Sequence, residues 1–186
     1  METRLSKIKM LVMDVDGTLT DGSMTFIGTE QMKTFNVYDG LGIRLAMNYG
    51  LRIGWITGNT SAAVTERARQ LGIVDVYQGS WYKPDSLREI ATRHELSMDQ
   101  IAYIGDDLND LPAFEVAGFS FAVRNATEEV KARADMVTDR PGGKGAVREA
   151  IEIILKAGGQ WEDAVKSFLA ELERDAASKR GPEAVA

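Results

Sequence analysis

Asp14 and Asp16 directly follow an apolar run, residues 8–13, that is typical of a strand buried on both faces. Side chains two positions apart on an extended strand point to the same side, so both carboxylates can face one site. Ligands of open parallel sheets bind beyond the carboxyl ends of the strands, which is where this pair lies. We therefore expect the two aspartates to line a ligand site.

A second acidic cluster, Asp106, Asp107 and Asp110, directly follows another short apolar run, residues 101–104. If the two strands are neighbours, up to five carboxylates converge, and like charges so close repel unless a cation lies among them. Carboxylate oxygens with no histidine or cysteine nearby suit Mg²⁺ better than zinc. Either cluster alone could consist of turn or helix-cap aspartates at the surface. The presence of both favours a magnesium site.

Two more polar segments follow predicted strands. One strand ends in Thr57, Gly58 and Asn59, where a hydroxyl and the N–H groups of a helix start can hold a phosphate. Lys83 follows the next strand and precedes a proline that is typical of a helix start. Each segment alone is an ordinary loop. Together they indicate a ligand site, because each of them follows a successive predicted strand.

These residues need a scaffold, and the alternation of short apolar runs with longer amphipathic ones predicts an α/β fold with a doubly wound parallel sheet. The predicted strands are residues 8–13, 52–56, 74–78, 101–104, 119–123 and 134–137, and the predicted helices are 41–49, 60–71, 85–95, 110–117, 127–133 and 145–157. Residues 20–37 break the alternation and predict a β-hairpin with its turn at Gly28–Gln31, which projects after the first strand.

The chain ends in a further amphipathic segment. Trp161, Val165, Phe168 and Leu172 fall on one helical face, which packs either on its own domain or on a partner subunit. We predict a core at residues 1–158, followed by a C-terminal helix and tail at 159–186.

The composition is that of an ordinary globular protein of 186 residues, long enough for one domain. The net charge of −6 argues against a nucleic-acid partner. No apolar run approaches the ~20 residues that span a membrane, and no signal peptide is recognisable, so we expect a cytoplasmic protein without a membrane partner. The absence of cysteine excludes disulfides and thiolate sites. His94, the single histidine, is expected to be solvated.

At this point the sequence resembles the haloacid dehalogenase superfamily. The four signatures of that superfamily occur in order as Asp14-x-Asp16-Gly-Thr18, Thr57-Gly58, Lys83 and Gly105-Asp106-Asp107-x-x-Asp110. The resemblance implies a Rossmann-like core and a Mg²⁺-dependent phosphatase. In it, Asp14 would attack phosphorus and form an aspartyl-phosphate, and Asp16 would protonate the leaving alkoxide and then deprotonate water.

The same resemblance implies roles for the remaining signature residues. Asp14, Asp106 and the backbone carbonyl of Asp16 would hold Mg²⁺. Thr57, Gly58 and Lys83 would bind the phosphoryl group, while Asp107 and Asp110 would support the site. A carboxylate is a weak nucleophile, but Mg²⁺ and a lysine can neutralise the phosphoryl oxygens and let it approach.

Most such enzymes carry a lid domain, and neither usual insertion point leaves room for one here. The flanking sequence resembles one uncapped group, the 3-deoxy-D-manno-octulosonate 8-phosphate (KDO 8-phosphate) phosphatases. The matching segments are Asp14–Gly22, Phe35–Ile43, Tyr77–Gly79 and Gly142–Glu149. That group is tetrameric, with hairpins from four subunits packed together, and the apolar hairpin residues Met24, Phe26, Ile27 and Phe35 fit this if they do not cover their own domain.

The resemblance further implies a phosphorylated sugar acid as substrate. Asp39, Asn59, Lys144 and Arg148 are the candidate residues for binding it, although the Gly142–Gly145 run could equally be a turn before a helix. KDO 8-phosphate phosphatases usually have arginine where this chain has Tyr38 and Asn59. A related group acts on the 9-phosphates of nine-carbon sugar acids, so such a substrate is the main alternative.

Two functions other than that of a phosphatase are possible. A receiver domain of a signalling system also forms an aspartyl-phosphate, but it has no need of an acid two residues after the nucleophile, where Asp16 lies. A non-catalytic phosphatase-like oligomerisation module should have lost a catalytic group, whereas Asp16 and Lys83 are both present.

Overall fold

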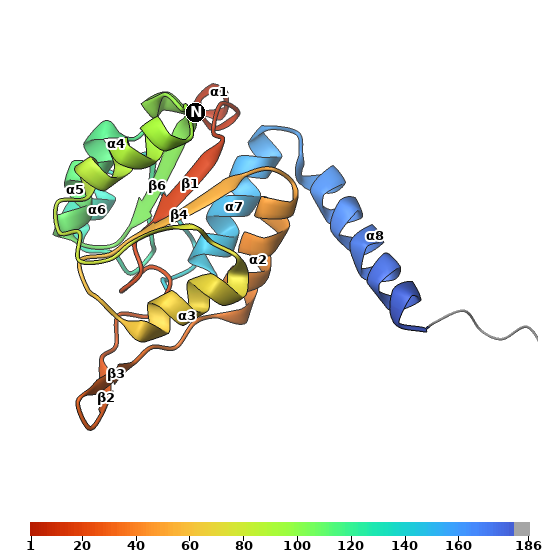
Figure 1. Ribbon diagram of the computed structural model, residues 1–186. Coiled ribbons are helices and arrows are strands. Elements are labelled where there is room, and N and C mark those ends of the chain that lie inside the picture. Colours follow the sequence, from red (N-terminus) through yellow and green to blue (C-terminus); the bar gives the residue numbers. More distant parts are fainter. Residues whose placement is uncertain (181–186) are drawn as a thin grey trace, which may run out of the picture.

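The computed structural model describes residues 1–180, and its centre is a six-stranded parallel sheet in the order β5-β4-β1-β6-β7-β8 (Figure 1). The strands are β1 (Met10–Met13), β4 (Arg52–Ile56), β5 (Asp75–Tyr77), β6 (Ile101–Gly105), β7 (Phe119–Ala122) and β8 (Met136–Val137). Every strand predicted for this sheet is present, most of them shorter than expected. The four residues of β1 are fully buried between β4 and β6, which gives the segment after it a rigid base.

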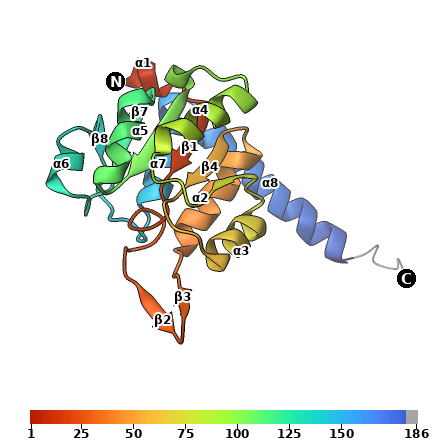
Figure 2. The same ribbon diagram turned by 60° about the vertical axis from the view of Figure 1, so that its left-hand side comes forward.

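Helices cover both faces of the sheet and confirm the doubly wound α/β fold. α2 (Val37–Asn48) and α7 (Ala146–Ala157) pack together on one face, and α4 (Lys83–Arg93) and α5 (Leu111–Val116) pack on the other (Figure 2). The remaining helical elements are α1 (Glu2–Leu5), α3 (Ala62–Leu71), α6 (Glu128–Lys131) and two 3₁₀ turns at Met98–Gln100 and Leu108–Asp110.

α2 begins at Val37, four residues before its predicted start at residue 41. The side chain of Asn36 accepts a hydrogen bond from the N–H of Tyr38 at 2.8 Å, which caps the helix. The cap therefore defines the start of this helix, while the apolar periodicity reports only its buried part.

The predicted hairpin consists of β2 (Thr25–Ile27) and β3 (Glu30–Met32), which pair antiparallel and project from the body (Figure 2). Its turn holds only two residues, so β3 begins inside the segment predicted as turn. Gly28, with φ at +60°, supplies the left-handed conformation that such a turn needs.

The apolar residues of this segment fall into two groups. Phe26 and Ile27 are 58% and 66% exposed, so they do not cover their own domain. Phe35 does: its ring stacks on Trp55 with 6.2 Å between centroids. Of the two readings of these residues, Phe35 therefore follows the second, since it is partly buried and packs against the core of its own domain.

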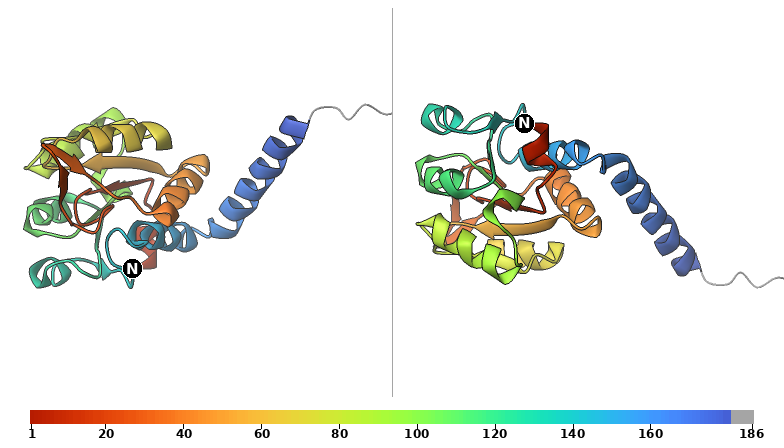
Figure 3. Two further views of the ribbon diagram at one scale, coloured as in Figure 1. Left: turned by 90° about the horizontal axis from the view of Figure 1, so that it is seen from below. Right: turned by 90° about the horizontal axis from the view of Figure 1, so that it is seen from above.

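α8 (Trp161–Arg180) leaves the body after packing its first turns against α2 and α7 (Figures 1 and 3). Trp161, Val165 and Phe168 pack on the core, as one of the two readings of this helix predicted, whereas Leu172 is 49% exposed. The end of the predicted tail, residues 181–186, lies outside the described residues. Within residues 1–180, no helix is both long and apolar enough to cross a membrane.

Candidate active site

A cleft of about 340 Å³ opens at the carboxyl end of the sheet. The chain runs from β1 to β4 on one side and later returns to β6 on the other, and such a switch point is where ligands of open α/β sheets bind. The cleft is lined by Asp14, Asp16, Thr57, Gly58, Asn59, Trp81, Asp106, Asp107, Leu108 and Asn109. The structure thus brings together signature residues that are up to 93 positions apart in the sequence (14 to 107).

Lys83 joins the two acidic clusters beneath this cleft. Its ammonium donates to Asp14 Oδ1 and to Asp110 Oδ1, both at 2.5 Å, and its side chain is fully buried. Burial alone lowers the pKa of Lys83, but the negative charges of Asp14 and Asp110 outweigh burial and raise it. The lysine therefore stays a cation at the base of the site.

Asp110 holds the backbone of the second acidic cluster in place by hydrogen bonds. It accepts the hydroxyl of Tyr103 at 2.9 Å and the backbone N–H groups of Asp106 and Asp107 at 2.8 and 3.2 Å. Gly105 makes this close approach possible, since a Cβ there would lie 2.3 Å from the Asp110 carboxyl carbon. Both oxygens of Asp110 are therefore committed to protein partners.

Carboxylate oxygens of Asp14, Asp106 and Asp110 lie within 4.8 Å of one another. Burial, followed by the charge of Asp110, raises the pKa of Asp14 well above its ordinary value and that of Asp106 to about 7. Lys83 alone does not balance this charge, and oxygen ligands at this spacing fit a hard divalent cation. With Asp110 already committed, Asp14 and Asp106 are the side chains of this group that remain free to bind a cation.

The opposite wall holds the carboxylate of Asp16. Its Oδ2 accepts the side-chain amide of Asn59 at 2.9 Å and the hydroxyl of Thr57 at 3.5 Å, while its Oδ1 accepts the ammonium of Lys33. Lys33 was absent from the residues expected at the site. Nothing in its sequence context marks it, because only the path of the hairpin brings it to Asp16.

The predicted substrate-binding residues do not all come together. Asn59 lines the cleft, and Lys144 is exposed outside it. Asp39 is buried and accepts the N–H groups of Gly145 and Arg148 at 3.2 and 2.8 Å, so its carboxylate caps the start of α7. Burial raises the pKa of Asp39, and these two hydrogen bonds oppose the rise.

Arg148 is likewise engaged away from the cleft. Its Nε donates to Glu152 at 2.8 Å, and its guanidinium lies 5.3 Å from the centre of the Trp161 ring. The structure therefore gives Arg148 a place between α7 and α8 and gives Asp39 a helix-capping role, instead of bringing either to the aspartates that line the cleft.

The glycines before α7 have a clear structural reason. The N–H of Gly143 donates to the carbonyl of Thr18 at 2.9 Å, and a Cβ on Gly142 would lie 1.7 Å from the carbonyl oxygen of Gly17. Only glycine permits this approach. The run therefore packs directly against the loop that follows Asp16.

Comparisons with known proteins agree with this geometry. A family model of haloacid dehalogenase-like hydrolases matches residues 55–151. The chain is 40% identical over 164 residues to the 3-deoxy-D-manno-octulosonate 8-phosphate phosphatase of Salmonella typhi, covering 87% of each chain. It is 38% identical over 172 residues to the Haemophilus influenzae enzyme of that name, covering 91% of this chain and 96% of the relative.

A solved structure extends the comparison to three dimensions. The 3-deoxy-D-manno-octulosonate 8-phosphate phosphatase of Moraxella catarrhalis, in complex with a magnesium ion, a phosphate ion and KDO, has a TM-score of 0.86 and 39% identity to this chain. The match covers 90% of this chain and 97% of that one.

Proposed function

This chain belongs to the haloacid dehalogenase-like hydrolases and, among them, to the KDO 8-phosphate phosphatases, and we propose that it hydrolyses KDO 8-phosphate to KDO and phosphate with Mg²⁺ as its cofactor. The observation that carries the proposal is the placement of Asp14. One of its oxygens is bound by buried Lys83, and it lines the cleft together with Asp16 and Asp106.

We infer that Asp14 is the nucleophile. As a carboxylate oxygen of Asp14 bonds to phosphorus, the bond from phosphorus to the sugar oxygen breaks, and Asp16 gives its proton to that oxygen. Lys83 places a positive charge beside Asp14 and lowers its pKa, against the larger effects of burial and of the charge of Asp110. Mg²⁺, held by Asp14, Asp106 and the carbonyl of Asp16, would offset the charge on the phosphoryl oxygens.

The second half of the reaction uses the same residues in reverse. Asp16 takes a proton from water, the water oxygen bonds to phosphorus, and the bond from phosphorus to Asp14 breaks to release phosphate. Thr57 and Gly58, at the end of β4, line the cleft where the transferring group would bind, and Asp107 lies on the opposite rim.

The direct test measures phosphate release with Mg²⁺ from KDO 8-phosphate, a nine-carbon sugar acid 9-phosphate and several hexose phosphates, with Asp14→Asn as control. We expect the highest kcat/KM for KDO 8-phosphate and no turnover by the control. Preference for the nine-carbon acid would instead mean that Tyr38 and Asn59, of which Asn59 lines the cleft, mark a change of substrate. Equal release by the control would contradict the mechanism.

We also propose that the chain forms a homotetramer through its hairpins and acts in the cytoplasm in the synthesis of the lipopolysaccharide sugar KDO. Met24, Phe26 and Ile27 are between 58% and 66% exposed on the hairpin, and adjoining apolar side chains of this size favour a partner surface. The mass in solution tests the assembly. Phe26→Ser should lower it, whereas Val74→Ser, at an even more exposed site on the body, should not.

A further inference from the structure

The side chain of Lys33 is buried although it follows the exposed hairpin. Its side chain is 2% exposed, whereas Phe26 and Ile27 on the same hairpin are 58% and 66% exposed. Removing an ammonium from water is unfavourable unless a charged partner compensates. The burial of this lysine therefore has to be explained by what its ammonium contacts.

That contact is the carboxylate of Asp16. The ammonium donates to Oδ1, while Oδ2 accepts Asn59 at 2.9 Å and Thr57 at 3.5 Å. The side chain of Asp16 is 28% exposed, so packing alone does not fix its orientation. Donors from two separate parts of the chain, the hairpin and the loop after β4, hold it instead.

This arrangement assigns different tasks to the two oxygens of Asp16. Oδ1 is paired with the ammonium of Lys33, whose positive charge stabilises negative charge on that oxygen, so Oδ2 is the oxygen left to exchange a proton with the leaving group. Oδ2 lies beside Thr57 and Asn59, which line the cleft. Without Lys33, either oxygen could carry the proton and the carboxyl group could rotate.

We propose that Lys33 is a positioning residue that holds Asp16 in the orientation from which it protonates the leaving oxygen, and that it thereby couples the hairpin to catalysis. The inference rests on the proposed phosphatase function. A rival role, binding the carboxylate of the substrate, is disfavoured because the ammonium is already paired and the side chain is almost wholly covered.

The test compares three substrates in Lys33→Met, Lys33→Arg and the control Lys166→Met, a change at a lysine that is 76% exposed on α8. KDO 8-phosphate has a poor leaving group and a carboxylate, a hexose 6-phosphate has a poor leaving group only, and p-nitrophenyl phosphate has a leaving group that needs no proton. The quantity measured is kcat/KM, which reports steps up to the first irreversible one.

We expect Lys33→Met to lower kcat/KM about 100-fold for both sugar phosphates and less than about threefold for p-nitrophenyl phosphate. Lys33→Arg should recover most of the loss, and Lys166→Met should match the unmodified protein. Equal losses on all three substrates would show a merely structural role. A loss confined to KDO 8-phosphate would show carboxylate binding, and no loss at all would show that Lys33 is dispensable. Each of these outcomes overturns the proposal.

A double variant distinguishes a role through Asp16 from a general folding defect. If Lys33 acts through Asp16, adding Lys33→Met to Asp16→Asn should not lower the rate on sugar phosphates further, and an additive loss would contradict the proposal. Failure of the proposed function is distinguishable, since the unmodified protein would then not release phosphate from KDO 8-phosphate. The comparison of hexose 6-phosphate with p-nitrophenyl phosphate would still test Lys33.

Discussion

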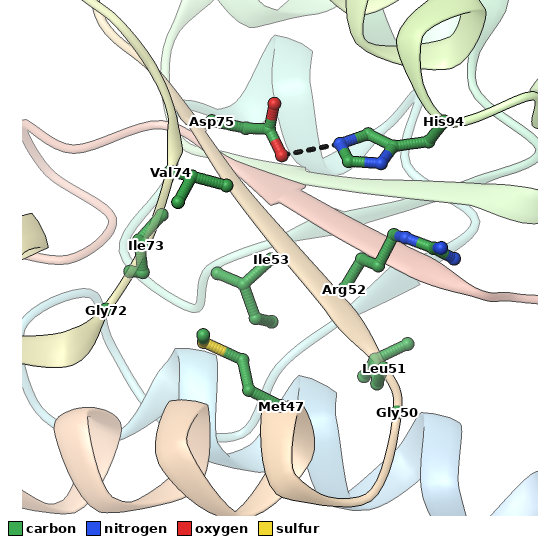
Figure 4. Close-up of a pocket in the computed structure, with 10 residues that line it drawn as sticks. All are labelled: Met47, Gly50, Leu51, Arg52, Ile53, Gly72, Ile73, Val74, Asp75 and His94. Atoms are coloured by element: carbon green, nitrogen blue, oxygen red, sulfur yellow. Dashed lines mark hydrogen bonds and ion pairs between the residues drawn. The ribbon is translucent and has the colours of Figure 1, made fainter.

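The two ends of the sheet each hold a buried carboxylate beside a cavity of similar size. At the amino end, a cavity of about 380 Å³ is bordered by Asp75, whose carboxylate accepts His94 Nε2 at 2.6 Å (Figure 4). The same carboxylate also accepts Arg93 at 3.0 Å. At the carboxyl end, the cleft of about 340 Å³ lies above Asp14, which shares Lys83 with Asp110. Cavity size and burial therefore do not distinguish the two ends.

Charge balance distinguishes them. Asp75 accepts from two side-chain donors, Arg93 and His94, and no other carboxylate is among the residues that line its cavity. At the carboxyl end three carboxylates crowd within 4.8 Å, with one buried lysine among them. Like charges at that distance destabilise a fold unless a ligand compensates. The excess of negative charge, more than the cleft itself, identifies the site that binds a cation and a phosphate.

The largest expected effect is on phosphate release, which should depend on the carboxylate at the carboxyl end of the sheet and not on the one at the amino end. Asp14→Asn should reduce phosphate release by about four orders of magnitude or more, because the amide cannot act as the nucleophile. Asp75→Asn should leave kcat/KM within about twofold, since Asp75 lies at the opposite end of the sheet. A phosphate-release assay checks both. Loss of turnover in the Asp75 variant with its fold intact would break the comparison.

The next largest effect is on stability, where we compare Lys83 at the carboxyl end with Arg93 at the amino end. Lys83→Met should lower the free energy of unfolding by about 3–5 kcal/mol, because it leaves Asp14 and Asp110 buried without their counter-ion. Arg93→Met should lower it by no more than about 1 kcal/mol, since Arg93 is 50% exposed and Asp75 keeps His94. Urea denaturation measures both, and similar losses would contradict the assigned difference.

The charge excess also predicts a pH dependence of the metal-free protein. The pKa of Asp106 rises to about 7 on folding from an ordinary 3.8, so the folded state binds this proton more tightly than the unfolded state. Stability should therefore fall as the pH rises from about 4 to about 7, by a few kcal/mol at most. Asp106→Asn should flatten this fall. Thermal denaturation in EDTA across this range measures it.

Magnesium provides the control for that experiment. A cation bound by the folded state alone stabilises it in proportion to the logarithm of its concentration. Added Mg²⁺ should therefore raise the melting temperature of the unmodified protein at pH 8 and raise it less in Asp106→Asn. An equal rise in both proteins would mean that Asp106 is not a ligand.

The last prediction concerns the amino end, where the expected effect is smaller than those at the carboxyl end. His94→Ala removes one of the two donors of Asp75 and should lower the free energy of unfolding by about 1–2 kcal/mol without changing kcat/KM. The sequence predicted a solvated histidine, and this was wrong, because the side chain is only 19% exposed and is paired with Asp75. A melting temperature unchanged from the unmodified protein would show that the pair contributes nothing.

Local sequence patterns predicted the parallel sheet and the order of the polar segments that follow its strands. Apolar runs and the polar residues that end them are local patterns, and a parallel sheet places all such ends at one edge. Asp14, Thr57 and Asp106 could therefore be placed together before any coordinates were known, and the structure puts all three at one cleft.

Only the tertiary structure decided which side chains meet. Lys33 reaches Asp16 through the path of the hairpin, Asp39 turns away to cap α7, and His94 finds Asp75 across the end of the sheet. These contacts join residues from different elements, so neither spacing nor residue type encodes them. The physical reason is that a pattern along the chain reports which face of an element is buried, whereas the partner of a polar side chain depends on how separate elements pack.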